Sequence, residues 1–515
     1  MLLTCTGALQ RAATRFAKRL AIRCPEGEFT YEQAWMRGLK LASALRQRGL
    51  TAQDCIATLE DNRLGAVDTY LAAAANNMVR APLYPRNSIE AHAHMLTITK
   101  AKILLVDEEL ATEEVCQLVS KVPTLQEVFV RGPGYEAWLD EQVPIDCVAD
   151  ASEGDLHLIR FSGGTTGLPK AIPLTNRVWM SQLRDLTYFL PRIEPGDVCL
   201  YMGTLSHGAG YLFLPTWMHG GVHELVVGFE AEKVIDIMEA GRTAFSFAAP
   251  SMLAALVRAK NAMNRDFSGL KALWIAGAPI SRETALLSRE VFGETVYQTY
   301  AQTEAVPGTV MMPSEWFSLV DGSSPLDSAG RAAPYTEFEI RDENNQALPV
   351  GGVGEIAFRC EGQMAGYLGA PELSIDKVRD GWILSGDIGF FDKNGFLYIV
   401  DRKGAMIISG GYNIWPAELE QVIAKIPGVL EVAVVPVPDE RWGETPLAIC
   451  CVQPGSEVTE ELVVEECRVH LGSYKKPGRV KLQTEPLPKT SVEKIDRRGL
   501  KEPYWAGHSK RVAGT

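Results

Sequence analysis

The stretch Phe161-Ser162-Gly163-Gly164-Thr165-Thr166-Gly167-Leu168-Pro169-Lys170 decides how the rest of this chain is interpreted. Its glycines let the backbone pass close to an anion, and its hydroxyls, amides and lysine can donate hydrogen bonds to phosphate oxygens. It is not the P-loop of common nucleotide triphosphatases, because Pro169 precedes the lysine and Ala171 replaces the magnesium-binding Ser or Thr. A flexible glycine-rich surface turn is the alternative. We interpret the stretch as a phosphate-binding loop.

The composition is typical of a globular protein with at least two domains. The chain has 515 residues, of which 46% are hydrophobic, so it can build more than one core. A net charge of -13 repels phosphate at long range and argues against nucleic-acid binding. The 10 cysteines form no CxxC pair, so we expect buried reduced thiols in a cytoplasmic protein, without zinc or disulfides. No apolar run approaches the roughly 18 residues that span a bilayer.

The N-terminal segment allows two interpretations. Its first 25 residues carry basic side chains and no acid, which is compatible with an organelle-targeting helix. The spacing of Leu9, Ala12, Phe16 and Leu20 instead favours an amphipathic helix that packs on the domain itself.

The pattern along the chain alternates short apolar runs with helical stretches. Runs at 55–59, 103–106 and 198–201 are expected strands, as are 244–250 and 271–279, and a helix is expected from Asn176. Strands that alternate with helices indicate an α/β fold with doubly wound parallel sheets.

Several further motifs follow the loop in order. His207 lies among glycines, and the segment 297–304 ends in Thr303-Glu304. Asp387 lies on a glycine-flanked turn; a carboxylate accepts two vicinal hydroxyls well, so Asp387 is a natural ribose clamp, with Arg402 as a donor from the other side. A second glycine loop spans 409–413, and Pro416 is placed to begin a helix before an expected strand at 429–437.

Taken in order, these motifs resemble those of the AMP-forming ligase superfamily, which includes acyl- and aryl-CoA synthetases, peptide-synthetase adenylation domains and luciferases. The family's Tyr-Gly-x-Thr-Glu motif is similar to 300–304, with Ala301 in place of the glycine. Its Pro-x-Thr-x-x-Gly-Lys-Ile-x-Arg motif is similar to 488–497, with Glu493 in place of the glycine that precedes Lys494. The resemblance covers nearly the whole chain.

The resemblance implies the substrates and a set of site residues. ATP and Mg²⁺ are the implied nucleotide and metal, with Glu304 as the metal ligand, and a carboxylic acid is the group activated. The implied catalytic residues are Lys494, which bridges the two reacting anions, Thr303, Glu304 and His207. The implied ATP-binding residues are Ser162, Gly163, Gly164, Thr165, Thr166, Gly167, Lys170, Gly277, Ala278, Pro279, Tyr300, Asp387 and Arg402.

An acyl pocket with small and aromatic walls is also implied, which favours a compact ring-containing acid. Relatives that activate catechol acids follow the histidine with an asparagine, whereas this chain has Gly208, which argues against a dihydroxybenzoate substrate. The expected wall residues are His207, Tyr211, Phe247, Gly277, Ala301 and Val306.

The sequence leaves open which class of molecule accepts the acyl group. CoA is the expected co-substrate, because it is the commonest partner of free-standing chains of this kind, with Gly410 and Gly411 along its channel. The alternative is the amine of an amino acid, as in relatives similar to coronafacic acid ligase. A carrier protein as acceptor also stays open. Luciferase-like oxidation has no specific signal in the sequence, and a non-catalytic binding protein would normally lack Lys494 or the Thr-Glu pair.

Two domains are expected. Residues 1–402 would form a large domain of doubly wound sheets with a β-barrel-like subdomain, and residues 403–515 a small mobile α+β domain that carries Lys494. The family swings its small domain between two half-reactions, and at the usual hinge position this chain has Gly404. No membrane span and no nucleic-acid partner are expected, and whether the chain forms a homodimer stays open.

Overall fold

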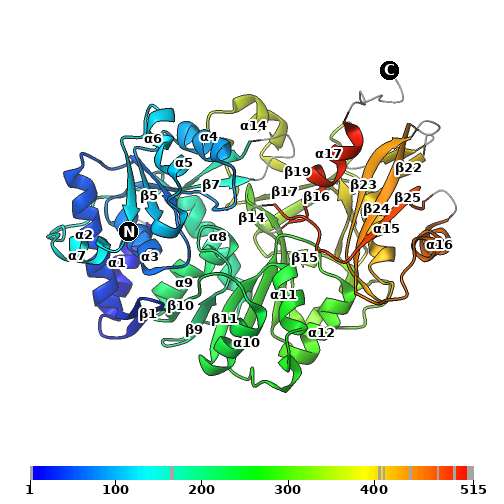
Figure 1. The fold of residues 1–515 in the computed structure, drawn as a ribbon, viewed down its shortest axis with the longest axis horizontal. Coiled ribbons are helices and arrows are strands. Elements are labelled where there is room, and N and C mark those ends of the chain that lie inside the picture. The colour runs from blue at the N-terminus through cyan, green and yellow to red at the C-terminus, as the bar shows by residue number, and fades with distance from the viewer. Residues whose placement is uncertain are drawn as a thin grey trace.

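The computed structural model describes residues 4–162, 168–403, 407–409, 412–439, 443–472, 475–490 and 494–506 (Figure 1). A large N-terminal domain contains three of the four sheets, and a smaller C-terminal domain, in orange and red, contains the fourth (Figure 1). The predicted α/β class is confirmed.

The first sheet has six strands in the order β6-β5-β3-β4-β7-β8. All neighbours are parallel except β7 and β8, which form an antiparallel pair with Ser162 opposite Lys170. The two ends of the phosphate-loop stretch therefore lie side by side. The strands are β3 (Cys55–Leu59), β4 (Val79–Pro82), β5 (Ile103–Asp107), β6 (Glu127–Arg131), β7 (Leu156–Ser162) and β8 (Lys170–Thr175).

The second sheet has nine strands in the order β15-β14-β13-β12-β11-β9-β10-β1-β2. The strands from β13 to β1 are parallel to one another, and the pairs at both edges are antiparallel. The strands are β1 (Leu20–Cys24), β2 (Gly27–Thr30), β9 (Val198–Tyr201), β10 (Val222–Leu225), β11 (Thr243–Ala248), β12 (Ala272–Ala276), β13 (Val296–Gln302), β14 (Ala305–Met311) and β15 (Arg331–Ala332).

Helices and short 3₁₀ turns connect these strands, as a doubly wound fold requires. The expected helix from Asn176 is α8, which begins where the Thr175 hydroxyl accepts a hydrogen bond from the backbone N–H of Val178. The helices are α1 (Cys5–Arg15), α2 (Tyr31–Gln47), α3 (Leu64–Ala75), α4 (Ile89–Thr99), α5 (Glu113–Cys116), α6 (Leu118–Lys121), α7 (Tyr135–Asp140), α8 (Asn176–Phe189), α9 (Phe213–Met218), α10 (Ala231–Ala240), α11 (Pro250–Val257), α12 (Arg282–Phe292) and α13 (Pro313–Trp316), and the turns are η1 (Glu108–Leu110), η2 (Gly208–Leu212), η3 (Ala262–Asn264) and η4 (Pro325–Asp327).

An antiparallel sheet occupies the place of the expected β-barrel-like subdomain. Its strands pair in the order β16-β17-β19-β18, and β20 pairs with β19. This pairing sets Asp387 directly opposite Arg402. The elements are β16 (Thr336–Arg341), β17 (Gly354–Cys360), α14 (Pro371–Lys377), β18 (Val378–Arg379), β19 (Trp382–Phe391) and β20 (Leu397–Arg402).

The C-terminal domain has its own cores, because two apolar clusters are formed entirely by residues after position 406. Pro416 is the first residue of a helix, as expected, since its missing N–H and fixed φ suit that position. The elements are β21 (Ile407–Ser409), β22 (Tyr412–Ile414), α15 (Pro416–Ile423), β23 (Val429–Asp439), β24 (Gly443–Val452), α16 (Glu460–Leu471), β25 (Arg479–Gln483) and α17 (Arg497–Trp505).

Some expected boundaries are wrong for identifiable reasons. The N-terminal helix ends at Arg15, so Leu20 begins β1 instead of continuing the helix. The strand expected over 244–250 ends at Ala248, because Pro250 starts α11. The cysteines within the described residues are unpaired thiols, but Cys116 and Cys147 are exposed and not buried.

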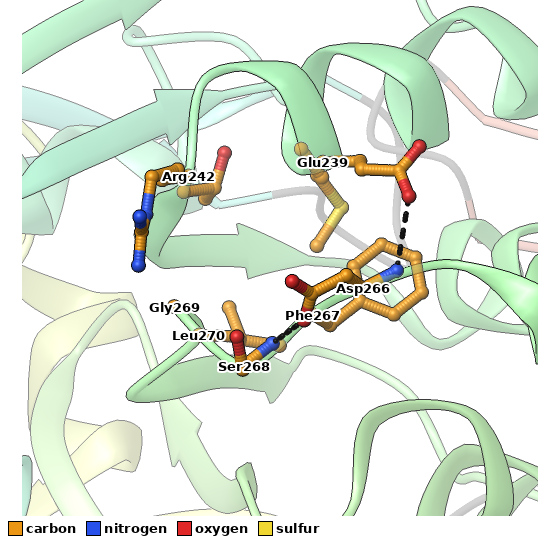
Figure 2. A pocket seen from close by; sticks show the side chains of 9 residues that line it. Glu239, Arg242, Asp266, Phe267, Ser268, Gly269 and Leu270 are labelled. Carbon is orange, nitrogen blue, oxygen red and sulfur yellow. Dashed lines mark hydrogen bonds between the residues drawn. The ribbon is translucent and has the colours of Figure 1, made fainter.

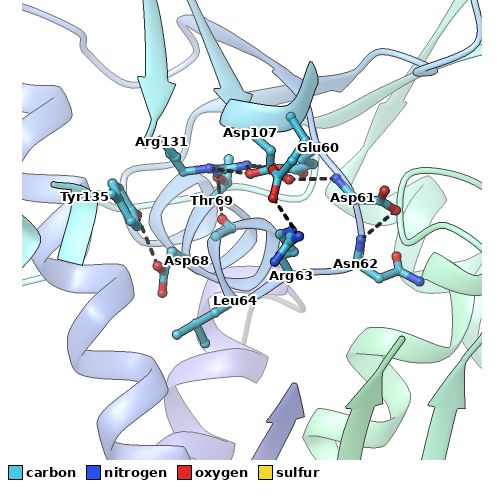
Figure 3. Close-up of polar contacts among 12 residues, drawn as sticks. Glu60, Asp61, Asn62, Arg63, Leu64, Asp68, Thr69, Asp107, Arg131 and Tyr135 are labelled. Carbon is cyan, nitrogen blue, oxygen red and sulfur yellow. Dashed lines mark hydrogen bonds and ion pairs between the residues drawn. The ribbon is translucent and has the colours of Figure 1, made fainter. Parts of the chain in front are cut away.

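A buried ion network ties the first sheet to α3 (Figure 3). Arg131, 3% exposed in its side chain, lies 2.9 Å from a carboxylate oxygen of Glu60 and 2.7 Å from one of Asp107. On α3, the Thr69 hydroxyl accepts from the Arg131 guanidinium at 2.7 Å. Asp68 on the same helix lies 2.8 Å from Arg37 and accepts the Tyr135 hydroxyl at 3.1 Å. Each charge in this network has a partner, which burial demands.

None of the helices in the described ranges combines the length and apolar character that crossing a membrane requires.

The buried histidines predict a loss of stability in acid. Burial lowers the pKa of His223 to about 3, and the pKa values of His157 and His207 are lowered to about 3 as well. The unfolded chain takes up these protons below its ordinary histidine pKa and the folded chain does not, so stability present above pH 6.5 is lost as the pH falls toward 3. Each histidine can contribute about 1.4 kcal/mol per pH unit in that window.

The variant His223→Phe should therefore show a shallower fall in unfolding free energy between pH 7 and pH 5.5, measured by urea denaturation. His470, which is exposed on α16, supplies the control His470→Gln, expected to keep the wild-type slope. An unchanged slope in His223→Phe would contradict this account.

Candidate active site

The predicted site residues gather at the carboxyl ends of the parallel strands of the nine-stranded sheet. Ala276 of β12 pairs with Thr299 of β13, so the segment after β12 and the end of β13 lie next to each other. The loop with His207 follows β9, and Phe247 lies near the end of β11. Open parallel sheets bind ligands at this edge, because the connections there leave room for them.

Asp387 is the centre of a hydrogen-bonded clamp. Its Oδ2 accepts the hydroxyl of Tyr300 at 2.7 Å and the amide of Gln302 at 2.9 Å, and its Oδ1 lies 2.9 Å from Nε of Arg402. The residue is 5% exposed. Burial and the Asp387 charge raise the pKa of Tyr300, so its hydroxyl stays a neutral donor. The predicted partners Asp387 and Arg402 are thus in contact.

Lys377, which sequence reasoning missed, extends this clamp. Its ammonium donates to Oε1 of Gln302 at 2.7 Å and to the carbonyl of Ser385 at 3.0 Å. Burial lowers the pKa of Lys377, whereas the charges of Glu304 and Asp387 oppose that change. Because Lys377 occupies the amide oxygen of Gln302, the amide nitrogen must face Asp387. No local pattern in the sequence distinguishes Lys377, because a lysine at the end of a helix, here α14, is common.

Glu304 and Thr303 form the turn between β13 and β14, which brings both to the same sheet edge. Glu304 is 6% exposed, and its carboxylate accepts the hydroxyl of Tyr367 at 2.7 Å. Lys170 lies over the ring of Tyr367, with its ammonium 5.1 Å from the ring centroid. The structure thus brings the lysine of the predicted phosphate loop and the predicted metal ligand into contact with the same tyrosine.

An aromatic wall surrounds His207. The imidazole stacks on Tyr84, with ring centroids 5.3 Å apart. Phe247 and Tyr211, both predicted, pack on a common neighbour, Trp274, at 5.0 and 5.9 Å between centroids. Burial, followed by the charges of Arg160 and Lys494, lowers the pKa of His207 to about 3, so the imidazole is neutral at physiological pH.

The remaining predicted wall and adenine residues lie along the same edge. Gly277 has φ +95°, which favours glycine, and a Cβ there would meet nothing within 4 Å, so the space beside it is open. Ala278 and Pro279 follow it on an exposed loop, Ala301 is half-buried, and Val306 is 4% exposed on β14.

Lys494 reaches this site from the C-terminal domain. The residue as a whole is exposed, yet the protein around its ammonium removes enough water to lower its pKa. The charges that act on this ammonium are those of Arg402, Asp387 and Glu304, and it acts in turn on His207. Charged groups from both domains therefore lie near enough to act on one another.

Other predicted residues lie outside the described residues: Gly163, Gly164, Thr165, Thr166, Gly167, Gly404, Gly410, Gly411 and Glu493. Ser162 at the end of β7 and Lys170 at the start of β8 mark where the phosphate loop begins and ends.

The donor set fits Mg²⁺ only together with a phosphate ligand. Across the described ranges, no cluster of three or more His, Cys, Asp or Glu side chains could hold a metal ion by itself. Mg²⁺ commonly takes one or two carboxylates and completes its shell with water and substrate phosphates. The single buried carboxylate of Glu304 fits that pattern.

A separate surface pocket of about 230 Å³ lies between the end of α10 and the segment before β12 (Figure 2). Glu239 accepts the backbone N–H of Asp266 at 3.0 Å there, and Asp266 accepts that of Ser268 at 2.9 Å. Thr243 and Leu270 in its lining lie at the amino ends of β11 and β12. The pocket is therefore at the sheet edge opposite the site and contributes nothing to it.

Comparison with known proteins identifies the family. Residues 9–368 match the family model for the AMP-binding enzyme, and residues 418–494 match that for the AMP-binding enzyme C-terminal domain. The chain belongs to the AMP-binding enzyme family. The predicted adenylate-forming superfamily is confirmed, and the chain is an AMP-forming ligase of that family.

The relatives within this family differ in their acceptors. A feruloyl-CoA synthase of Amycolatopsis is 31% identical over 483 residues, which are 92% of this chain and 94% of the relative. The amide bond synthetase McbA from Marinactinospora thermotolerans has a TM-score of 0.85 at 26% identity and covers 96% of this chain and 99% of its own. ATP-bound MatB from Rhodopseudomonas palustris has a TM-score of 0.87 at 24% identity. It covers 98% of this chain and 99% of its own, and it shows the shared fold. The family match supports ATP binding by this chain.

Lys377 provides a test of the clamp. In Lys377→Met the Gln302 amide loses the partner that orients it, so we expect the KM for ATP to rise about 3- to 10-fold, in keeping with about 1 kcal/mol for one hydrogen bond. The kcat should change less, because Lys377 positions the clamp and does not contact the reacting atoms in this account.

Pyrophosphate exchange measured over a range of ATP concentrations gives both constants. Lys393→Met, on an exposed lysine, is the matched control and should leave the KM for ATP unchanged. A loss confined to kcat in Lys377→Met would refute the positioning role.

Proposed function

We propose that this enzyme adenylates a carboxylic acid with ATP, releases pyrophosphate, and transfers the acyl group from the adenylate to the thiol of CoA. The observation that carries the first step is the placement of Lys494. Its ammonium lies within electrostatic reach of Asp387, Glu304 and His207, which are the proposed ribose clamp, metal ligand and acyl-wall residue.

The main obstacle to adenylation is electrostatic. A carboxylate and the α-phosphate of ATP are both negative, so catalysis must chiefly neutralise and align them. A compact ammonium that has lost part of its water shell offers a strong field to both anions. Lys494 is therefore the proposed bridge between them.

The other residues divide the work of holding ATP. Asp387 is proposed to accept the ribose hydroxyls, with Arg402 opposite, while Tyr300 lies under the adenine beside Gly277, Ala278 and Pro279. Thr303 is proposed to contact the α-phosphate. The phosphate-loop residues hold the departing phosphates, and Mg²⁺ on Glu304 would offset their charge when bound. The phosphate-loop residues in this proposal are Ser162, Gly163, Gly164, Thr165, Thr166, Gly167 and Lys170.

The acid is proposed to lie against the wall of His207, Tyr211, Phe247, Gly277, Ala301 and Val306. The neutral imidazole and the packed rings favour a compact, ring-containing acid, because long alkyl chains need a deeper tunnel. The aromatic contacts of Tyr211 and Phe247 with Trp274 fix the positions of both rings.

Transfer from the adenylate requires Lys494 to leave. We propose a domain boundary after Arg402, with residues 403–515 rotating about Gly404 so that Gly410 and Gly411 line the channel for the acceptor. One site then serves both half-reactions, and the adenylate is kept from water until the thiol arrives.

CoA is the preferred acceptor because the feruloyl-CoA synthase combines 31% identity with coverage of 92% of this chain. The amide route is a second candidate, favoured by the structural likeness to the amide bond synthetase. An ammonium must lose a proton before it attacks, and a histidine whose pKa is about 3 accepts one weakly. His207 is therefore a poor base for the amine route.

The variant Lys494→Ala tests the adenylation step. Wild-type protein should exchange labelled pyrophosphate into ATP only when a suitable carboxylic acid is present. Lys494→Ala should lower that rate at least about 100-fold, because the charge between the two anions is lost. It should still transfer the acyl group from a synthetic adenylate.

The control Lys481→Ala removes an exposed lysine of the same domain and should behave as wild type. Equal losses in both half-reactions of Lys494→Ala would show that the lysine acts elsewhere.

The acceptor is tested with an acid that supports exchange. Incubation with ATP, the acid and CoA should yield a thioester, detected by mass spectrometry. The same mixture with a panel of amino acids in place of CoA should accumulate only adenylate.

If an amide forms instead, and forms faster toward alkaline pH as the amine loses its proton, the CoA assignment is wrong. The adenylation step would stand in that case.

A further inference from the structure

Arg160 is a buried cation beside the proposed acyl pocket to which no role has been given so far. It lies on β7, two residues before Ser162, and is 3% exposed. Within the described part of the chain, its Nε is buried without a hydrogen-bond partner, and no carboxylate forms an ion pair with it. Such a group is costly to bury, so the structure has to offset it in another way.

Aromatic rings supply part of that offset. The guanidinium carbon lies 4.2 Å from the ring centroid of Tyr211 and 5.0 Å from that of Trp179. Cation–π attraction of this kind stabilises a guanidinium but leaves its N–H donors without acceptors.

Other buried arginines show how this chain treats a structural cation. Arg131 has carboxylate oxygens of Glu60 and Asp107 within 2.9 and 2.7 Å (Figure 3). Arg80, which lies over Tyr70 at 4.3 Å, is attracted by the charge of Glu60, and that attraction opposes the lowering of its pKa by burial. Arg160 differs because its guanidinium packs on Tyr211, a residue of the proposed acyl wall.

Two observations place the guanidinium at that wall. Its Nη2 lies 3.4 Å from the position that a Cβ on Gly210 would take, three residues after His207. Burial raises the pKa of Tyr211, and the Arg160 charge opposes that rise. Tyr211 is a proposed wall residue, so Arg160 lies beside the proposed acyl pocket.

We propose that Arg160 recognises a second carboxylate on the substrate, so that the acid activated by this enzyme is a dicarboxylic acid. The proposal rests on the proposed function and narrows its substrate class. A carboxylate supplies two acceptors in the planar geometry that a guanidinium prefers, and it can accept from the buried Nε–H that has no partner.

The reacting carboxylate has its own cation, Lys494. His207 lies within electrostatic reach of both Lys494 and Arg160. A compact skeleton between the two acid groups, such as one benzene ring or a short chain, is therefore the first to test.

Matched pairs of acids test the proposal: benzoate with isophthalate, and pentanoate with glutarate. In acid-dependent pyrophosphate exchange, wild-type kcat/KM should favour the diacid of at least one pair by tenfold or more. A site built to bind a polar group rejects analogues that lack it. In Arg160→Met this preference should fall at least tenfold, and Arg160→Lys should keep part of it, because the charge remains.

Arg80→Met is the matched control, since it removes a buried arginine on the neighbouring strand, and it should retain the wild-type preference. Protection of the wild-type protein against thermal unfolding by isophthalate, but not by benzoate, gives a second measurement that needs no variant.

Three outcomes would overturn the proposal. The wild-type kcat/KM in pyrophosphate exchange could be higher for the monoacid, or equal for the two acids of each pair. Arg160→Met could lower kcat/KM equally for both acids of a pair, which would mean that Arg160 holds the reacting carboxylate or only supports the fold. Exchange with monoacids alone would reject this inference and leave the proposed function standing, whereas no exchange with any acid of a broad panel would reject both.

Discussion

The buried carboxylate of Asp387 is the constraint on which the candidate site depends. It accepts donors from β13 of the nine-stranded sheet, through Tyr300 and Gln302, and from the end of β20, through Arg402. A buried acceptor with three donors holds its neighbours in one arrangement, because loss of any partner leaves a polar group unsatisfied. The position of the antiparallel sheet relative to the large sheet is thereby coupled to the groove in which the nucleotide is proposed to bind.

A second coupling joins the six-stranded sheet to the proposed acyl wall. Asn62, in the segment after β3, donates from its amide to the carbonyls of Tyr201 and Gly203 and accepts the backbone N–H of Leu205 at 2.9 Å. These contacts hold both ends of the segment that leads to His207. The histidine is therefore positioned by a side chain from the other sheet, which explains how a loop rich in glycine can present one ring in a defined place.

The sequence predicts the parts of the site that lie in continuous motifs. Asp387 and Arg402 follow from the chemistry of a ribose clamp, and the α/β order follows from alternating apolar runs. Lys377 and Arg160 were missed, because their roles depend on contacts across sheets: Lys377 on Gln302, and Arg160 on rings from α8 and η2. In the sequence, a single basic residue at a helix end or within an apolar strand does not indicate a functional role. Burial without a carboxylate partner can be recognised only in the structure.

Gly208 has a consequence for how the specificity of this pocket can change. A Cβ at that position would lie 2.3 Å from Cζ and 2.4 Å from Cε1 of Phe247, far inside van der Waals contact. Any side chain at 208, including the asparagine of catechol-acid relatives, is incompatible with the phenyl ring as it stands. The two positions are therefore epistatic: a side chain beside His207 requires residue 247 to become smaller or its ring to move, so this clash would oppose any single substitution at 208.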